Sequence, residues 1–496
     1  MKKSLAITLA LLLVIITGFS LRIYKLSDEN IWYDEVSSVY YSQQSLSHIL
    51  SLRDTSPPLY YVLLHFIIIL FGGSEFSIRF LSVLFGTASI YFLYLLGKEL
   101  FNRKVGFFSA LLLALSPLHV YYSQEARTYS LLIFLTIMSM YYYIRLDKKT
   151  ELYNIILYIV TTGLLLYSHV YSIFLVISQN MHQIYKHRLN LSKLKKWFLI
   201  QLVIAVFYLP WIIYLAGIVN QYKYSWIPKP TIIDLLITLY TYSSGEIFSL
   251  SGLVLIFLFI ALIIYFIKSR FFVHVRDKFI ILVFWALSPI FIPFLYSIFF
   301  TPIFTSKYTI ISSVPLYIIS GFVFTKTNHR KIRTIFFLII TFLIIVNLIQ
   351  ATSIKKDQWK LISDYIKGNA NKNELVYVIE DYEILPFSYY FNNGCFKDIG
   401  LYNCMEKSNI YPLNETKLKN IKDKNFWLIL SNKNNKDGNK ERIVDYINKN
   451  YKVVSQKEFT LKPDIYYYNT IHQFLKDKNL IKREYNLIRV YHLKRI

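Results

Sequence analysis

An acidic pair, Asp34 and Glu35, stands a few residues after a long apolar run, in the stretch NIWYDEVSSVYY. A carboxylate of this kind can take a proton from a hydroxyl group as a general base, or it can bind a cation. It can also be a solvated loop charge, or an acid in the first turn of a helix, where the helix dipole favours negative charge. For an isolated pair the last two readings are favoured, so a functional reading needs support from other residues.

Other polar residues recur beside apolar runs further along the chain. SQEARTY contains Gln124, Glu125 and Arg127, YSHVYS contains His169, and TPIFTSKY contains Lys307 and Tyr308. Each has a structural reading as well. Glu125 and Arg127 can pin a loop, a histidine can be a hydrogen-bonded turn residue, and a lysine can extend to the membrane interface. Whether these residues meet depends on the topology of the chain.

The composition is that of a polytopic membrane protein. Of the 496 residues, 55% are hydrophobic and only 17% are charged, whereas soluble domains carry about 25% charged residues. The formal net charge of +25 would suggest a nucleic-acid partner in a soluble protein. Here much of the excess lies in short loops between apolar runs, which has a membrane explanation, so we expect membrane lipids and no nucleic acid as partners.

Eleven transmembrane helices are predicted from runs of roughly spanning length, about 20 residues. They fit residues 4–24, 76–96, 106–122, 128–145, 152–169, 171–186, 197–217, 249–267, 279–299, 308–325 and 334–351. The first follows Lys2 and Lys3 as a signal peptide would, but no small-residue cleavage site comes after it. We therefore expect this helix to be retained.

The first outer loop, residues 25–75, is predicted to contain juxtamembrane helices. Residues 58–71 are apolar but short, and counting them as a span would turn the later basic loops outward. We expect them to form a helix at the outer surface, begun by two prolines. Ahead of it, Val36, Val39, Tyr40, Leu46 and Leu50 fall near helical spacing and predict a second, amphipathic helix.

Basic residues set the predicted orientation. With a cytoplasmic N-terminus, the cytoplasmic pieces hold 21 Lys and Arg in about 49 residues, and the opposite segments before residue 351 hold 8 in about 110. This asymmetry is the positive-inside rule. The acidic pair, the 124–127 segment, His169 and Lys307 then all lie on the outer side of the cell membrane. Charged groups from separate hairpins at one membrane boundary favour a functional site.

After Gln350 the composition changes to Lys, Asn and Asp, which separates a transmembrane domain, 1–351, from a tail, 352–496. Predicted helices in KDQWKLISDYIKGN and KERIVDYINKNY alternate with predicted strands in NELVYVIE, NFWLILS and LIRVYHLK. This alternation indicates a small extracytoplasmic α/β domain. Its outward, oxidising location favours a disulfide between Cys395 and Cys404 over two free thiols.

The chain also resembles a known family. WYDE after the first span, SPPLYYVLLHF, and the segment from GGSEFS to EARTYSL resemble the bacterial and archaeal relatives of protein O-mannosyltransferases. The aminoarabinose transferases of lipid A belong to the same C-type membrane glycosyltransferase group. The resemblance covers about residues 20–215, weakens through TPIFTSKYTIISSVPLY and is vague in the tail. Ser56 stands where many relatives have His, and Lys307 where many have Arg. These departures leave the implied reaction class intact but weaken any inference about the acceptor.

The resemblance implies a polytopic α-helical C-type fold and transfer of a sugar from a polyprenyl-phosphate donor to a protein, lipid or glycan acceptor on the outer face. It implies that Asp34, with Glu35 beside it, supplies the catalytic carboxylate. A leaving lipid phosphate needs cations, for which Arg127 and Lys307 are the candidates. Further substrate-binding candidates are Tyr60, Gln124, Glu125, His169 and Tyr308. No cofactor is expected to be required; a divalent metal on Asp34, Glu35, Glu125 and His169 is open but not favoured.

Three alternatives stay open. An oligosaccharyl transferase would share the architecture but use a pyrophosphate donor and a metal. A secondary transporter would place its charged groups near mid-membrane in broken helices, whereas these charges lie at helix ends. A scaffold without catalytic activity would have no need of the acidic pair.

Overall fold

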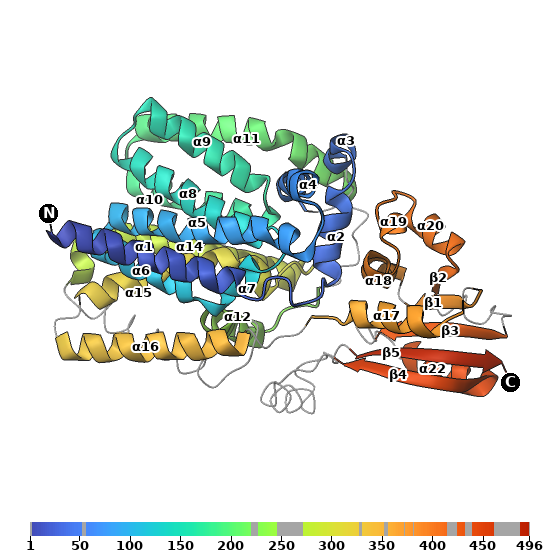
Figure 1. Ribbon diagram of the computed structural model, residues 1–496. Coiled ribbons are helices and arrows are strands. Elements are labelled where there is room, and N and C mark those ends of the chain that lie inside the picture. The colour runs from blue at the N-terminus through green and yellow to red at the C-terminus, as the bar shows by residue number, and fades with distance from the viewer. Residues whose placement is uncertain are drawn as a thin grey trace. The chain divides into compact units, whose positions relative to one another are not determined.

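The computed structural model describes residues 2–51, 56–219, 227–245, 271–326, 330–351, 356–371, 373–379, 381–413, 424–431, 439–460 and 487–495 (Figure 1). The chain forms two compact units. The helical unit comprises Met1–Leu26, Leu50–Leu63 and Arg79–Thr352, and the tail unit comprises Ser27–Ile49, Leu64–Ile78 and Ser353–Ile496. Most of the first outer loop therefore groups with the tail, which the sequence did not predict.

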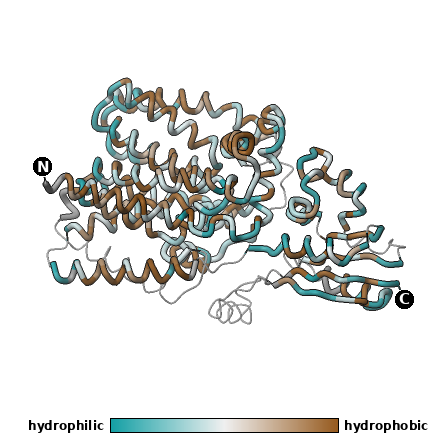
Figure 2. Tube along the Cα trace, in the orientation of Figure 1, coloured by the Kyte–Doolittle hydropathy of each residue, from teal (hydrophilic) through white to brown (hydrophobic). Residues whose placement is uncertain are grey.

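Helices occupy ten of the eleven predicted spans, and the eleventh, 249–267, lies outside the described residues. They are α1 (Lys2–Ile23), α5 (Glu75–Leu100), α6 (Arg103–Leu115) with α7 (Pro117–Ser123), α8 (Tyr129–Lys148), α9 (Leu152–Leu166), α10 (Ile173–His187), α11 (Leu191–Val219), α14 (Phe271–Phe299), α15 (Ser313–Lys326) and α16 (Arg330–Ala351). Within the described ranges, six helices are long and apolar enough to cross a membrane, and the α6–α7 pair is a seventh candidate. Figure 2 shows their mainly hydrophobic colouring.

The predicted span 106–122 is not one straight helix, because α6 and α7 meet at an angle of 61°. Ser116 is extended, with φ −67° and ψ 120°, and Pro117 begins α7. Proline disfavours the helical conformation of the residue before it, which ends α6. The hydroxyl of Ser116 accepts a hydrogen bond from the backbone N–H of His119 and so caps the start of α7.

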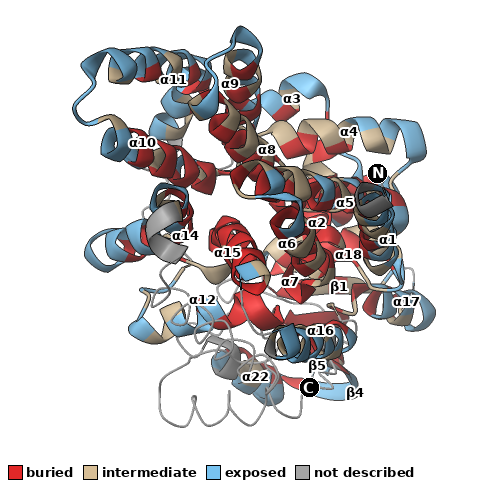
Figure 3. Ribbon diagram, turned by 90° about the vertical axis from the view of Figure 1, so that its left-hand side faces the viewer, coloured by how far each residue is buried: buried red, intermediate tan, exposed pale blue. Residues whose placement is uncertain are grey.

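Small residues let the helices around α6 pack closely. A Cβ atom on Gly321 of α15 would lie 3.0 Å from the carbonyl oxygen of Val105, and one on Gly97 of α5 would lie 2.8 Å from the Cα of Gly106. Contacts of this kind are typical of helix pairs in membranes, where van der Waals packing drives association. The buried faces of α6, α8 and α15 appear red in Figure 3, whereas α11 and α16 carry many exposed residues.

A further helix, α12 (Ile232–Ser244), lies in the region that the sequence assigned to an outer segment. A capping box begins it: Asp234 accepts hydrogen bonds from the backbone N–H and the hydroxyl of Thr231. It packs against α7 and against η3 (Ser306–Ser312), the 3₁₀ segment before α15.

The first outer loop contains α2 (Tyr33–Ser42), α3 (Leu46–Leu50) and α4 (Leu59–Phe71). The predicted short apolar helix is present as α4. The single amphipathic helix expected from Val36 to Leu50 is wrong, because it is divided into α2 and α3. Its apolar residues also do not share one face: Val36 and Val39 are fully buried, whereas Leu50 is exposed.

The tail folds as an α/β domain, as its alternating pattern predicted. The expected elements are present as α17 (Trp359–Asn369), β1 (Leu375–Ile379), β3 (Asn425–Ser431), α22 (Asn439–Asn450) and β5 (Leu487–Arg495). Unpredicted elements are η4 (Asp381–Glu383), α18 (Ile384–Phe391), α19 (Asn393–Phe396), α20 (Leu401–Lys407), β2 (Ile410–Leu413) and β4 (Tyr451–Thr460). The sheet order is β2-β1-β3-β5-β4, with β1 parallel to β2 and β3, and β5 antiparallel to β3 and β4.

Candidate functional site

His169 lies at the centre of one group of the predicted site residues. Helix α9 ends at Leu166, and the next turn, η1 (Val170–Ser172), begins after His169. The imidazole Nδ1 accepts a hydrogen bond of 3.1 Å from the backbone N–H of Tyr171, so the histidine caps this turn. His169 is therefore a hydrogen-bonded turn residue, as one of its two interpretations from the sequence predicted.

The environment of His169 also brings two predicted cations to the same place. Its side chain is buried, and burial, followed by the positive charges of Arg127 and Lys307, lowers the pKa of His169 to about 3. The imidazole is consequently neutral at physiological pH. A positive charge lowers the pKa of a histidine appreciably only when the two groups are close together. The loop between α7 and α8, which carries Arg127, and the segment between α14 and α15, which carries Lys307, therefore meet at this ring.

Hydrogen bonds fix the connection that carries Arg127. The hydroxyl of Ser82 donates to the carbonyl oxygen of Arg127 at 3.3 Å and is itself 3.1 Å from the hydroxyl of Tyr60. The hydroxyl of Thr128 donates to the carbonyl oxygen of Ser168 at 2.8 Å. Tyr60 is buried, so it contributes to this site through Ser82 and the backbone of Arg127.

Aromatic contacts fix the connection that carries Lys307. The ring of Tyr308 lies 4.9 Å from that of His169 and 5.4 Å from that of Tyr171, between centroids. The hydroxyl of Tyr171 donates to the carbonyl oxygen of Ile303 at 2.8 Å. The Nζ atom of Lys307 lies 5.6 Å from the ring centroid of Tyr308. Arg127, His169, Lys307 and Tyr308 therefore form one group, which we call the cationic cluster.

Gln124 and Glu125 have different surroundings. The amide of Gln124 donates to the carbonyl oxygens of Leu21, Arg22 and Tyr24, at 3.3, 3.2 and 2.8 Å. It thereby satisfies backbone groups that the end of α1 leaves open. Glu125 is fully buried, and its carbonyl oxygen accepts from the backbone N–H of Arg127. The amide of Gln124 thus has a structural task that its sequence context did not indicate.

Asp34 and Glu35 belong to the tail unit, in the first turn of α2. Glu35 is fully buried, and its Oε2 lies 2.9 Å from Nζ of Lys356. Asp34, the preceding residue, is only partly buried. The structure therefore distinguishes the two carboxylates: Glu35 is paired with a cation inside the unit, and Asp34 retains access to solvent.

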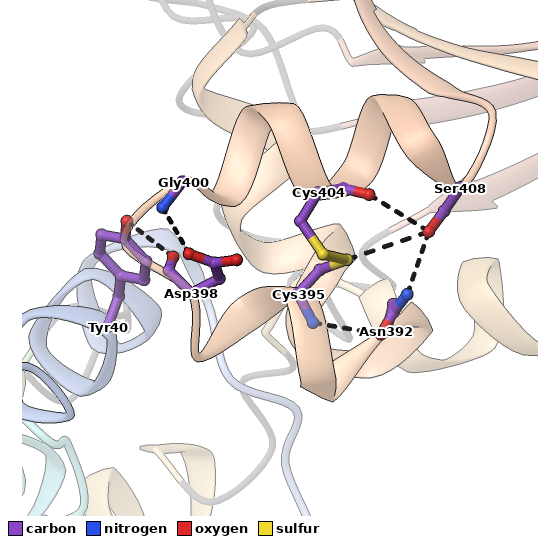
Figure 4. Close-up of a disulfide and its surroundings, with 7 residues drawn as sticks. All are labelled: Tyr40, Asn392, Cys395, Asp398, Gly400, Cys404 and Ser408. Atoms are coloured by element: carbon purple, nitrogen blue, oxygen red, sulfur yellow. Dashed lines mark hydrogen bonds between the residues drawn. A yellow bond between two sulfur atoms is a disulfide. The ribbon is translucent and has the colours of Figure 1, made fainter.

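A disulfide joins Cys395 and Cys404, and so links α19 to α20 (Figure 4). The loop between the two cysteines accepts hydrogen bonds from the hydroxyl of Tyr40 in α2, at the carbonyl oxygens of Asp398 and Ile399. The disulfide-bonded segment therefore contacts the helix that carries the acidic pair.

Sequence reasoning missed two important charged residues. Arg22 is fully buried and donates to Ser123 Oγ and to the carbonyl oxygens of Gly18, Leu113 and Ala114. An arginine at the end of an apolar run is a signal that could have identified it. Lys356 stands among many other lysines of the tail, and nothing in its sequence context distinguishes it.

Residues 55–214 match the model of the dolichyl-phosphate-mannose-protein mannosyltransferase family. No curated protein matches the chain in sequence.

The fold is shared with solved structures over most of the chain. ArnT from Cupriavidus metallidurans in the apo state superposes with a TM-score of 0.58 and 12% identity, over 98% of each chain. The same protein bound to undecaprenyl phosphate gives 0.54 and 11%, over 97% of each chain. The archaeal oligosaccharyltransferase AglB from Archaeoglobus fulgidus, in complex with an inhibitory peptide and a dolichol-phosphate, gives 0.52 and 13%, over 86% of this chain and 69% of that one.

Proposed function

We propose that this chain, a C-type membrane glycosyltransferase by its fold and by residues 55–214, moves a sugar from a polyprenyl-phosphate donor to an acceptor on the outer face of the membrane. The acceptor is a hydroxyl-bearing protein, lipid or glycan. The N-terminus is cytoplasmic and the tail extracytoplasmic in this proposal, as the distribution of basic residues favours.

The observation that carries the proposal is the cationic cluster. Arg127 and Lys307 come from different loops. A hydrogen bond from Thr128 to Ser168 and the ring contact between Tyr308 and His169 bring both loops to the buried ring of His169. Two cations beside a neutral imidazole can bind the negatively charged phosphate of a lipid that leaves as a phosphate monoester. Preorganised cations stabilise the charge that develops on such a leaving group, and the planar guanidinium of arginine can bind two phosphate oxygens at once.

Asp34 is the general base of the proposed reaction. Its carboxylate takes the proton of the acceptor hydroxyl, the acceptor oxygen forms a bond to the anomeric carbon, and the bond from that carbon to the phosphate oxygen breaks. The lipid leaves as a polyprenyl phosphate, and the proton stays on Asp34. The partial exposure of Asp34 suits this role better than the buried, paired state of Glu35.

Substitution of the acidic pair tests the assignment. Asp34→Asn keeps the shape but removes proton acceptance, so turnover should fall by about 100- to 10,000-fold with donor binding largely intact. Glu35→Gln should lower turnover by a smaller factor than Asp34→Asn. The assay is transfer from a synthetic polyprenyl-phosphate sugar by purified, detergent-solubilised enzyme. Normal turnover of Asp34→Asn with inactive Glu35→Gln would move the role to Glu35, and normal turnover of both would refute a base at this position.

One alternative is an oligosaccharyl transferase that uses a pyrophosphate donor and a divalent metal, since this chain shares its fold with the oligosaccharyltransferase AglB. Chelation separates the two. With a monophosphate donor and no resident metal, turnover should be unchanged after treatment with EDTA. Loss of turnover that is restored by added Mn²⁺ or Mg²⁺, together with preference for a pyrophosphate donor, would favour the alternative.

A further inference from the structure

The ion pair between Glu35 and Lys356 joins the first outer loop to the tail inside one unit. The Oε2 and Nζ atoms are 2.9 Å apart; Glu35 is fully buried, and the side chain of Lys356 is 10% exposed. Removing one partner of a buried ion pair is strongly destabilising, so this pair contributes to holding both residues in place. This pair therefore fixes the first turn of α2 to the start of the tail domain.

Further tail contacts hold the segment that leads into α2. The backbone N–H of Lys356 donates to Glu29 at 3.2 Å, so the same residue contacts the chain both before and within the helix. The hydroxyl of Tyr390 in α18 accepts from the backbone N–H of Ile31 and donates to Glu75, each at 2.7 Å. The approach to Asp34 is thus tied to α18 as well as to Lys356.

The helix itself is also held by aromatic residues. The ring of Tyr33 makes a T-shaped contact with Tyr382 of η4 at 5.2 Å between centroids. Near the other end of α2, the hydroxyl of Tyr40 donates to the carbonyl oxygen of Asp398 at 3.3 Å (Figure 4). It also donates to the carbonyl oxygen of Ile399 at 3.1 Å. Side chains at the start and near the end of α2 therefore contact the tail.

We propose that the tail is part of the catalytic apparatus and that Lys356 is a positioning residue for Asp34. The inference rests on the proposed function, in which Asp34 is the base. Successive helical residues point about 100° apart, so holding Glu35 inside the unit sets the direction of Asp34. A reacting group displaced by about 1 Å can lose about 100-fold in rate.

Variants of Lys356 test the positioning role. Lys356→Met, which removes the charge, should lower kcat by about 10- to 100-fold while KM for the donor changes less than about 2-fold. Lys356→Arg keeps a cation and should restore most of kcat. The matched control is Arg489→Met, which breaks the ion pair between Arg489 and Glu458 on the tail sheet and should leave kcat unchanged.

The double variant Lys356→Met/Glu35→Gln separates positioning from stability. The double variant removes both charges of this ion pair, so the melting temperature should rise above that of Lys356→Met. If Lys356 positions Asp34, kcat should stay low in the double variant. Recovery of kcat together with the melting temperature, or an equal loss of kcat in Arg489→Met, would overturn the proposal.

These measurements also distinguish this inference from the proposed function. An active wild-type enzyme with an inactive Asp34→Asn variant and a fully active Lys356→Met variant would overturn the positioning role alone. A wild-type enzyme that does not transfer sugar from any polyprenyl-phosphate donor would overturn the proposed function.

Discussion

The rings of His169 and Tyr308 meet in a T-shaped contact with 4.9 Å between their centroids. This contact joins the turn after α9 to the 3₁₀ segment before α15. Lys307 precedes Tyr308 in that segment, and the charges of Arg127 and Lys307 both lie near His169. Because the ring of His169 is buried between aromatic residues and cations, its protonation is coupled to the stability of this region.

The coupling predicts a reduced acid sensitivity for His169→Gln. The folded-state pKa of about 3 lies below the unfolded value of about 6.5. The unfolded chain therefore binds the proton first, and the wild type loses stability as the pH falls through 6.5 toward 3. At pH 5 this loss is about 2 kcal/mol relative to pH 7.

Glutamine keeps an acceptor for Tyr171 but does not titrate. Thermal unfolding in detergent at pH 7.5 and 5.0 should show a larger decrease for the wild type than for the variant. Equal decreases in melting temperature for the wild type and the variant would mean that the folded protein binds a proton at His169 by pH 5.0.

Arg127→Lys is expected to weaken donor binding. The substitution keeps the charge but loses the two-point guanidinium fork, so KM for the donor should rise by about 10- to 100-fold. Lys307→Arg is the matched control, because it adds a second guanidinium group to the same cluster and should not weaken donor binding. The measurement is KM with a polyprenyl-phosphate sugar, beside the yield of folded protein. Loss of folded protein in Arg127→Lys, with Lys307 variants unaffected, would assign Arg127 to the fold instead.

Gln124→Glu should lower stability without affecting donor binding. A carboxylate would face the three carbonyl oxygens at the end of α1 that the amide now serves. The free energy of unfolding should fall by about 1–3 kcal/mol, because these groups lose their donor. Gln124→Met introduces no charge, so it should lower the free energy of unfolding by less than Gln124→Glu does. A raised KM for the donor at unchanged melting temperature would place Gln124 among the substrate-binding residues.

The predicted orientation can be tested with single cysteines at exposed positions. Lys449 lies in α22 of the tail, and Asn190 lies between α10 and α11. In intact cells a membrane-impermeant maleimide should label Lys449→Cys and not Asn190→Cys. The wild type, whose two cysteines form a disulfide, gives the background. The reverse labelling pattern would invert the topology and remove the site from the outer face.

Hydropathy and charge predicted much of the fold, because a helix that crosses lipid must be long, apolar and internally hydrogen-bonded. The break between α6 and α7 was missed although its signal was present. The whole run 106–122 had the length of a span, and Pro117 was read as part of it. Strand β4 was missed for another reason. It is an edge strand whose Val453 and Val454 are exposed, so it lacks the alternating burial that marks a strand in sequence.

The sequence identified the residues of the cationic cluster but not their supports. Arg127, His169 and Lys307 have side chains with recognisable chemistry at predicted helix ends. Ser82 and Thr128 act through hydroxyl groups on backbone carbonyls, and hydroxyl residues are common throughout the chain. The pairing of Glu35 with Lys356 spans 321 residues, and a single sequence contains no periodicity that would reveal such a contact.

The buried guanidinium of Arg22 sets an order for assembly during synthesis. Its acceptors at Leu113 and Ala114 belong to α6 and are made 91 and 92 residues later in the chain. Until then the charge must stay near water or lipid headgroups, because hydrocarbon offers it no partner. The guanidinium of Arg22 therefore obtains these two acceptors only after α6 has been synthesised.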